Sequence, residues 1–389
     1  MKIQDVETFV LKIAGDEAYL GPLRDGSEIG PEYTVRAPWR SLYSSRFETM
    51  LVKITADDGT AGWGEALAPV APEVPAAIVN RLLTPVLTGM DATRPRPAWA
   101  QLRDLMRERG HLGGHQADAL AAVDIALWDL AGKLTGRRVA DLAGGAFRER
   151  LPVYVSGLPR STDAERAALA ADWVQRGARS IKLHLGHGID ADLATFDAVA
   201  AAAPSLRIAV DAHWVYTVPE AVQLADELAD RGAWFLEAPL APEDVVGHAE
   251  LVARARIPIA VGEAMRHRYE FSQWIGSRAL RIAQPDVART GITEALIVAE
   301  LAGAAHVPVA PHHSTGMAVA WAAGVHLSAA IEHFEAFEYQ PTSADVGARI
   351  LRQPLELTPA EFTLPDGPGL GIDVDEEAVR RYAEEYALT

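Results

Sequence analysis

The chain has no cysteine in its 389 residues, which excludes disulfides, thiolate nucleophiles and zinc sites built on thiolates. Any chemistry must therefore come from oxygen and nitrogen groups. Lysine is also scarce, with five residues against 31 arginines. A lysine inside an apolar segment of this chain therefore needs an explanation other than solubility.

Long apolar runs and basic clusters are missing as well. No stretch of about 18 uninterrupted apolar residues is present to cross a bilayer, and the N-terminus lacks the apolar core of a signal peptide. The formal net charge of −17 opposes binding to nucleic acid and to anionic lipid. We expect a cytoplasmic protein that binds neither nucleic acid nor a membrane. An anionic substrate would need a local source of positive charge.

A repeat of strand-like and helical segments begins near residue 150. Turns and Ala-rich amphipathic stretches separate eight apolar, β-rich runs, which are LPVYV, SIKLHL, LRIAVD, AWFLEA, IPIAVGE, ALRIAQ, VPVAP and EAFEY. Strands that alternate with helices predict βαβ units and a parallel sheet, and eight of them favour an α/β fold of the TIM-barrel type. A doubly wound sheet is the alternative.

The segments around this repeat predict an accessory domain. Strand patterns at 6–12 and 48–55, the turn DDGTAGWGE and a helix-rich segment from 74 onward indicate an α+β unit. The long connection at 13–47 is typical of an active-site lid. We therefore expect three parts, which are an α+β capping domain at 1–130, a barrel at 131–345 and a C-terminal segment at 346–389 that packs back on the cap.

From the second barrel strand onward, every strand is expected to end in an ionisable residue. From Asp211 onward these residues follow one another at steps of 26, 26, 23, 26 and 26 positions. In a barrel such positions converge on the C-terminal mouth, where active sites lie. The full set is Lys182, His184, Asp211, Glu237, Glu263, Asp286, His312 and Glu338.

Three successive strands end in carboxylates, at Asp211, Glu237 and Glu263. Carboxylates packed together repel and desolvate one another, so a divalent cation is the natural partner. Ligands that offer only oxygen suit Mg²⁺, with Mn²⁺ also possible. The alternative is a helix N-cap at Asp211 and two surface glutamates.

The next two strands end in Asp286 and His312. A carboxylate bonded to one imidazole nitrogen sets the tautomer and raises the basicity of the other nitrogen, which predicts a general base. A purely structural histidine is the alternative. His313 complicates the assignment, because a shift of one residue would exchange the two directions.

The stretch RSIKLHLGHGID alternates apolar and polar residues, so Lys182 and His184 share one face of a strand. Lys182 would face a substrate carboxylate as a second cation, and His184 would approach from the side opposite His312. An edge strand with one wet face is the alternative.

Together these residues and motifs resemble the enolase superfamily, in its mandelate racemase-like branch. The resemblance spans nearly the whole chain, through DDGTAGWGEA, ALAAVDIALWDLAGKLTGRRVADLAGG, VDAHW, LEAPLAPED, IPIAVGE, QPD, APHH and FEY. It implies a modified (β/α)7β barrel whose N-terminal cap is completed by the C-terminal segment. It also implies metal ligation by the three carboxylates, a catalytic His312 and Asp286 dyad, and a Glu338 that hydrogen-bonds the substrate carboxylate. Homo-oligomers are common in the family.

One departure from the family pattern concerns the second strand. Racemases of this branch carry Lys-x-Lys there, whereas this chain has Lys182-Leu183-His184. His213, in VDAHW, is similar in placement to the leaving-group acid of some sugar-acid dehydratases of the branch; a loop-capping histidine is the alternative.

The leading hypothesis is a Mg²⁺-dependent acid-sugar dehydratase. His312 would remove the proton alpha to a carboxylate, and His213 or His184 would protonate the departing hydroxyl, to give a 2-keto-3-deoxy acid. The alternatives are a racemase or epimerase, a cycloisomerase that opens a sugar-acid lactone, and a non-catalytic binding protein. Candidates for gripping the rest of the substrate are Tyr33, Arg36, Trp39, Arg40, Arg266, His267 and Arg268.

Overall fold

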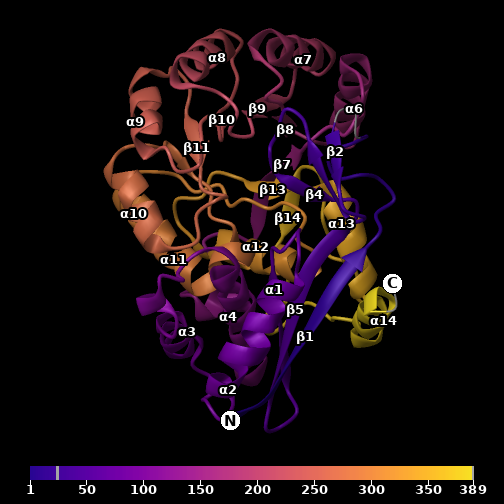
Figure 1. The fold of residues 1–389 in the computed structure, drawn as a ribbon, viewed down its shortest axis with the longest axis vertical. Helices are drawn as coiled ribbons and strands as arrows, with labels where there is room; N and C mark the ends of the chain where they lie inside the picture. Colours follow the sequence, from indigo (N-terminus) through magenta and orange to yellow (C-terminus); the bar gives the residue numbers. More distant parts are fainter. Residues whose placement is uncertain (23–25, 388–389) are drawn as a thin grey trace.

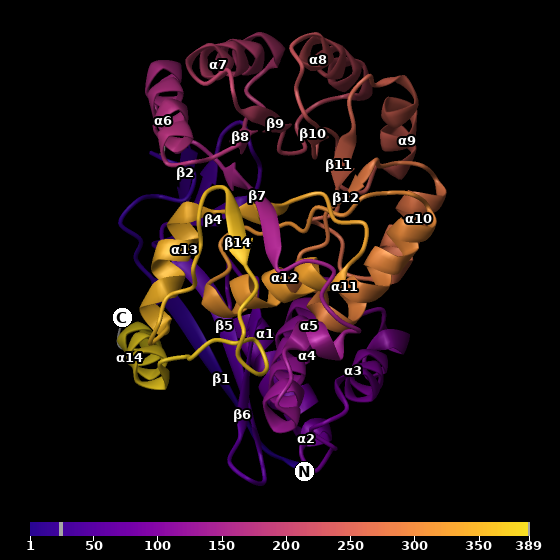
Figure 2. The same ribbon diagram turned by 180° about the vertical axis from the view of Figure 1, so that it is seen from behind.

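The computed structural model describes residues 1–22 and 26–387 (Figure 1). Residues 23–25 of the predicted lid lie outside this part. A cap built on an antiparallel sheet occupies one end of the molecule, and a barrel of parallel strands ringed by helices occupies the other (Figures 1 and 2). None of the helices in the described ranges combines the length and apolarity needed to span a bilayer.

The cap sheet has the strand order β1-β5-β6 and is antiparallel throughout. Its strands are β1 (Ile3–Ile13), β5 (Phe47–Ala56) and β6 (Ala61–Ala66). The first two confirm the predicted strands, while β6 occupies most of the segment DDGTAGWGE that was predicted as a turn. Gly64 lets β6 lie against a helix, because an added Cβ would stand 1.8 Å from the carbonyl oxygen of Ala122.

Helices of the cap cover one face of this sheet and lead into the barrel. They are α1 (Glu73–Ile78), the π-helix η1 (Val79–Leu83), α2 (Thr84–Leu87), α3 (Pro95–Asp104), the 3₁₀ turn η2 (Arg107–Arg109), α4 (Gly114–Thr135) and α5 (Val139–Leu142). Helix α4 carries the packing against β6 and runs across the predicted domain boundary at 130/131.

The barrel sheet has the parallel order β13-β7-β8-β9-β10-β11-β12. Its strands are β7 (Arg150–Ser156), β8 (Ser180–His184), β9 (Arg207–Asp211), β10 (Leu236–Glu237), β11 (Ile259–Val261), β12 (Ile282–Ala283) and β13 (Phe337–Tyr339). The run VPVAP is not a regular strand, because Pro308 and Pro311 lack the N–H that a ladder needs. Val309 nevertheless bridges in parallel to Ala283 on one side and Phe334 on the other, which closes the ring. The predicted modified TIM barrel is confirmed.

Each barrel helix follows a strand or, in the last case, the VPVAP run, and lies on the outside of the ring (Figures 1 and 2). These helices are α6 (Asp163–Gln175), α7 (Ile189–Ala202), α8 (Val218–Asp230), α9 (Val245–Arg254), α10 (Arg268–Gly276), α11 (Val287–Ala304) and α12 (Ala318–Ala330).

An apolar cluster lies in the barrel directly below the ionisable ring. Ala209 and Phe235 belong to this cluster and precede Asp211 and Glu237 by two positions. Residues two apart on a strand point to the same side. The strand period therefore places a dry layer under Asp211 and Glu237, and Ala310 and Ala336 stand in the same relation to His312 and Glu338.

The predicted lid contains a small antiparallel sheet with the order β2-β3-β4, which sequence reasoning did not anticipate. Its strands are β2 (Gly26–Ile29), β3 (Tyr33–Arg36) and β4 (Leu42–Ser44). The segment lies over the mouth of the barrel, near β7 and β8 (Figure 1).

The C-terminal segment returns to the cap. It contains α13 (Pro341–Gly347), the 3₁₀ turn η3 (Ala348–Ile350), β14 (Glu361–Thr363), which pairs antiparallel with β7, and α14 (Glu376–Ala387). Helix α14 is tied to the cap sheet by ion pairs of 2.8 Å from Lys53 to Glu376 and from Arg380 to Glu7.

A buried carboxylate joins the cap to the barrel. Glu65 on β6 accepts hydrogen bonds from the backbone N–H groups of Met317 (2.5 Å) and Ala320 (2.8 Å) and from the hydroxyl of Thr49 (2.9 Å). It therefore satisfies donors at the start of α12, which carry no partner within the helix. Burial raises the pKa of Glu65 to about 7.

This raised pKa predicts a pH-dependent stability. Because the folded state holds the Glu65 proton more tightly than the unfolded chain, the group contributes stability below the unfolded pKa that is lost as pH rises through about 7. The difference in unfolding free energy between wild type and Glu65→Gln, which cannot titrate, should rise by roughly 2 kcal/mol from pH 8 to pH 5. Urea unfolding at both pH values measures it, and parallel pH profiles for the two proteins would contradict it.

Candidate active site

A cavity of about 880 Å³ opens at the C-terminal mouth of the barrel, under the lid. The lid contributes residues from its 38–46 stretch, including Trp39 and Tyr43, and the loops after β9 and β11 contribute others. Six of the predicted strand-end residues line it, namely Lys182, His184, Asp211, Glu263, His312 and Glu338. The predicted convergence of the strand ends is therefore present in the structure.

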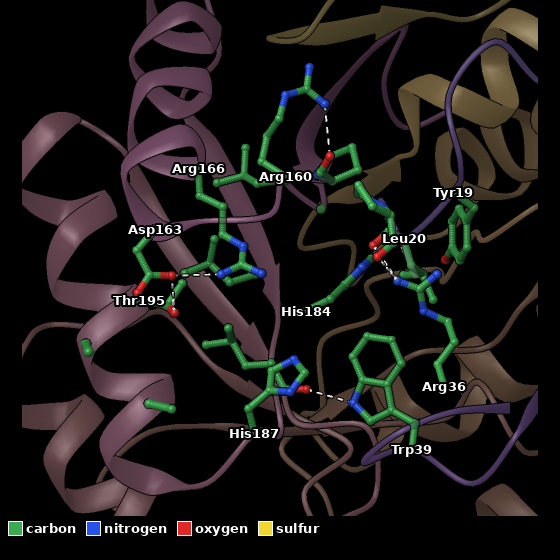
Figure 3. Close-up of a pocket in the computed structure, with 18 of the residues that line it drawn as sticks. Tyr19, Leu20, Arg36, Trp39, Arg160, Asp163, Arg166, His184, His187 and Thr195 are labelled. Atoms are coloured by element: carbon green, nitrogen blue, oxygen red, sulfur yellow. Dashed lines mark hydrogen bonds and ion pairs between the residues drawn. The ribbon is translucent and has the colours of Figure 1, made fainter. Parts of the chain in front are cut away.

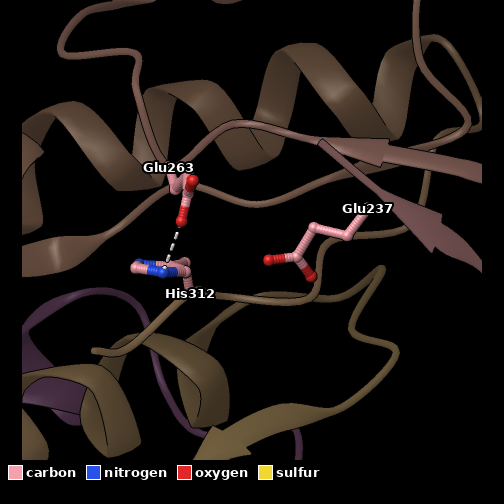
Figure 4. Close-up of side chains that lie close together, drawn as sticks. All are labelled: Glu237, Glu263 and His312. Carbon is pink, nitrogen blue, oxygen red and sulfur yellow. Dashed lines mark ion pairs between the residues drawn. The ribbon is translucent and has the colours of Figure 1, made fainter. Parts of the chain in front are cut away.

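Glu237, Glu263 and His312 point toward one another, with one ligand atom from each within 4.8 Å of the others (Figure 4). Asp211 is outside this group, but it pairs with Glu237 across the adjacent strands β9 and β10. Its Oδ1 accepts the backbone N–H of His213 at 2.9 Å. Each of the other two carboxylates accepts a hydrogen bond from a neighbouring side chain. Trp214 Nε1 donates to Glu263 at 2.9 Å, and Gln284 Nε2 donates to Glu237 at 2.6 Å.

Burial raises the pKa of Asp211 to about 7 and that of Glu237 to about 8, against the charge of Lys182. Neighbouring carboxylates whose ionised form is disfavoured in this way are stabilised by a nearby positive charge. An oxygen-rich set with few nitrogen ligands matches Mg²⁺ better than zinc. The residues present therefore fit a divalent cation, with Asp211, Glu237 and Glu263 as the candidate ligands.

Lys182 is fully enclosed, at 1% exposure, between two carboxylates. Its Nζ lies 2.6 Å from Glu237 and 2.7 Å from Glu338. Burial opposes the charged ammonium, but these two carboxylates raise the pKa of Lys182 well above its ordinary value. Lys182 is thus a permanent cation beside the candidate metal ligands.

Glu338 is held by donors from three sides. Ser156 Oγ donates to it at 2.5 Å, Tyr154 Oη at 3.2 Å and the backbone N–H of His313 at 3.2 Å. Ser156 was not singled out from the sequence, although its position on the inward row of β7 after Tyr154 could have indicated it.

His312 and Asp286 form the predicted pair, with Nδ1 of the histidine 2.7 Å from the carboxylate. The other nitrogen, Nε2, lies 2.8 Å from Glu263. Burial opposes the imidazolium, but the charge of Glu338 and the hydrogen bonds to Asp286 and Glu263 raise the pKa of His312 well above its ordinary value. The orienting carboxylate leaves Nε2 as the nitrogen available for proton transfer.

His313 points away from the cavity. Its Nε2 lies 3.0 Å from the carbonyl oxygen of Gly316, and its ring packs on Trp321 with centroids 3.8 Å apart. The structure therefore separates the two adjacent histidines, and His312 is the one that lines the cavity.

Two further histidines, His184 and His213, line the same cavity with ring centroids 5.4 Å apart. Ser156 Oγ lies 3.1 Å from Nε2 of His184. Burial lowers the pKa of His213 to about 4 and that of His184 well below its ordinary value. Both are therefore neutral imidazoles near pH 7.

Trp39 closes the lid over this pair. Its ring stacks on His213 with centroids 3.9 Å apart and planes inclined by 11°, and its Nε1 donates to the carbonyl oxygen of Leu185 at 3.0 Å. Figure 3 shows Trp39 extending from the lid toward the end of β8. This position is consistent with the predicted role of Trp39 as a substrate contact.

A second cavity, of about 330 Å³, lies beyond Trp39 and His184 (Figure 3). The predicted substrate contact Arg36 lines this cavity and not the one that holds His312. Its guanidinium donates at 3.1 Å to the carbonyl oxygens of Leu20 and Gly21, so it braces the lid backbone.

Two other predicted substrate contacts also lie away from the mouth cavity. Tyr33 packs toward the cap sheet, where its hydroxyl donates to Glu48 at 3.2 Å. His267 caps α10 by accepting the backbone N–H of Glu270 at 3.3 Å. Neither position supports a substrate contact in this conformation. The sequence could not show this, because tertiary packing sets the direction of a side chain on a lid strand or loop.

Of the predicted arginines, Arg40 and Arg266 line the mouth cavity, whereas Arg268 pairs with Glu294 at 2.5 Å. Arg266 is engaged by Asp118 of the cap helix α4 at 2.9 Å. Arg289, which the sequence did not single out, lines the cavity as well.

Both halves of the chain match known family models. The enolase C-terminal domain-like model matches residues 165–378, and the mandelate racemase/muconate lactonizing enzyme N-terminal domain model matches residues 33–144.

Relatives of known activity match almost end to end. The chain is 33% identical to the D-galactarolactone cycloisomerase of Agrobacterium fabrum over 90% of this chain and 96% of that protein. It is 32% identical to the D-galactonate dehydratase of Ralstonia nicotianae over 85% of this chain and 90% of that protein.

Solved structures show the same architecture. A member of the enolase superfamily from Agrobacterium tumefaciens superposes with a TM-score of 0.93 at 35% identity, over 97% of this chain and 98% of that one. A racemase from Streptomyces coelicolor with bound magnesium superposes with a TM-score of 0.84 at 26% identity, over 98% of this chain and 99% of that one.

Proposed function

The chain belongs to the enolase superfamily, in the mandelate racemase and muconate lactonizing enzyme family, and from this premise we propose that it eliminates a β-oxygen substituent from an acid sugar. Enzymes of this superfamily use Mg²⁺ to stabilise an enediolate intermediate. We propose Asp211, Glu237 and Glu263 as the ligands, with Mn²⁺ as a substitute metal. The observation that carries the proposal is the oriented His312 beside these carboxylates.

The bound cation would stabilise the negative charge that develops on the substrate carboxylate. Lys182 adds a second, fixed positive charge to that carboxylate. With Glu263 engaged by the cation, Nε2 of His312 would lose the Glu263 contact that helps to raise its pKa and would be free to take the proton from the alpha carbon. Asp286 would stabilise the resulting imidazolium. Trp39 excludes water above the reacting carbons.

In the dehydration, the Cα–H bond breaks, the Cβ–O bond breaks and a hydroxyl leaves with one proton as water. The resulting enol becomes a 2-keto-3-deoxy acid. The sequence analysis expects His213 or His184 to protonate the departing hydroxyl. Burial lowers the pKa of both, so that neither holds an imidazolium proton to give near pH 7. We propose instead that His312, once it carries the α-proton, delivers it to the hydroxyl that leaves from the same face.

A second candidate is the opening of an acid-sugar lactone. There the Cβ–O bond belongs to the ring, and the departing group is a carboxylate that needs no proton. The neutral His184 and His213 favour this reaction, as does the similarity to the D-galactarolactone cycloisomerase.

A panel of aldonic acids, aldaric acids and their lactones, incubated with Mg²⁺ in D₂O, tests the proposal. We expect a 2-keto acid whose mass falls by one water for an open acid and is retained for a lactone, apart from deuterium. Racemised or epimerised acid without keto acid would refute elimination. Failure of Mg²⁺ to shift the melting temperature, with no turnover of any acid, would favour a non-catalytic protein.

A further inference from the structure

Two polar side chains of the mouth cavity are not explained by the proposed reaction. Nε of Arg289 and Oγ1 of Thr315 line the cavity's walls as buried atoms without a hydrogen-bond partner among the described residues. Thr315 is 8% exposed and follows His312 in the loop after the seventh barrel position. Arg289 is half-buried in the first turn of α11, three residues after Asp286.

The lack of a partner distinguishes Arg289 from the arginines around it. Arg266 is paired with Asp118 at 2.9 Å and Arg268 with Glu294 at 2.5 Å. Arg289 makes no ion pair or side-chain hydrogen bond to any residue in the described ranges. A buried Nε–H without an acceptor is costly, and an anion in the cavity would supply that acceptor.

Two carboxylates near Arg289, Asp118 and Asp286, are already bonded to other side chains. Arg266 and Arg289 repel each other. Burial, and to a smaller extent the charge of Arg289, lower the pKa of Arg266. One carboxylate, Asp118, is bonded to Arg266, while Asp286 is bonded to His312. The guanidinium of Arg289 therefore lies near two carboxylates without bonding either, which leaves its donors open to a further anion.

The geometry points to an anion subsite: we propose that Arg289 and Thr315 bind the second carboxyl group of a dicarboxylic acid sugar. A guanidinium recognises a carboxylate through two parallel hydrogen bonds, and a hydroxyl can add a third. This inference rests on the proposed function, because the first carboxylate is assigned to the cation and Lys182. With a lactone, the same subsite receives the carboxylate that forms when the ring opens.

Two acids of identical configuration test the subsite. Galactarate ends in a carboxylate where D-galactonate ends in a hydroxymethyl group, and kcat/KM is measured for both with Mg²⁺. We expect wild type to prefer galactarate by at least about tenfold, and Arg289→Gln to lower the ratio of the two kcat/KM values by about 10- to 100-fold. Arg289→Lys should restore part of the ratio, because the charge is kept.

Two more variants control this experiment. Arg46→Gln removes an exposed arginine of the same cavity and should leave the ratio within about twofold, since a solvated charge contributes little. Thr315→Val keeps the side-chain shape and should lower the ratio by about threefold or more. Thr315→Val carries the test if Arg289→Gln fails to fold.

An unchanged ratio in Arg289→Gln or, failing that variant, in Thr315→Val would overturn the subsite, as would a wild-type preference for D-galactonate. These outcomes leave the proposed function intact as long as either acid exchanges its α-proton with D₂O. Absence of exchange and turnover for every acid and lactone would instead refute the proposed function itself, and the subsite with it.

Discussion

His312→Asn is expected to lower kcat by about 10³-fold and to abolish exchange of the substrate α-proton with D₂O. The side-chain amide of Asn can still bond Asp286, but it cannot accept a proton near neutral pH. Loss of a positioned general base costs about 10²- to 10⁴-fold, and we expect at least the middle of this range because His312 would serve both proton transfers. Steady-state kinetics and NMR of the α-proton measure the two effects.

His213→Asn is the matched control, because it removes a histidine that lines the same cavity. If His312 handles both proton transfers, this variant should keep at least about a tenth of the wild-type kcat, and exchange should persist. A loss of about 100-fold in dehydration with normal exchange would instead identify His213 as the acid. Normal exchange by His312→Asn would contradict the base assignment outright.

Lys182→Met is expected to lower the unfolding free energy by about 3 to 5 kcal/mol, which is the usual cost of leaving a buried charge without its partner. Lys182 is 1% exposed and pairs with Glu237 and Glu338, both of which are also 1% exposed. Its removal leaves two buried carboxylates to repel each other. Methionine keeps the length of the side chain, so lost packing adds little.

Chemical denaturation without divalent cations measures this effect. The control is Arg150→Gln, since the pair of Arg150 and Glu361 is exposed at 73% and 42% and should contribute no more than about 1 kcal/mol. Added Mg²⁺ should restore part of the stability lost in Lys182→Met, because a ligand that binds only the folded state stabilises it. A loss no larger than that of Arg150→Gln would contradict the assigned role of Lys182.

The barrel and the ring of strand-end residues were predictable because both follow from local periodicity. A period of two places Ala209 and Asp211 on one face, and the βα repeat brings successive faces to the same mouth. The same parity would have found Ser156, which shares the inward row with Tyr154. Gln284 precedes Asp286 by two and bonds Glu237, but its amide carries no charge that marks it in the sequence.

The lid was predictable in place but not in structure. Its small sheet joins short, half-exposed strands whose pattern is weak, and Tyr33 and Arg36 there face the cap and the lid backbone. Arg289 escaped notice for a related reason. What marks it is that its Nε has no hydrogen-bond partner within the part of the chain that the structure describes. The partners of a side chain are set by tertiary structure rather than by sequence spacing.

We propose that Asp211, Glu237 and Glu263 hold one divalent cation beside His312. A crystal structure grown in Mn²⁺, read through the anomalous signal of the metal, tests it most directly. We expect a single anomalous peak bonded to an oxygen of each carboxylate, with Glu263 moved away from Nε2 of His312. A cavity without such a peak, with Glu263 still paired to His312, would contradict it.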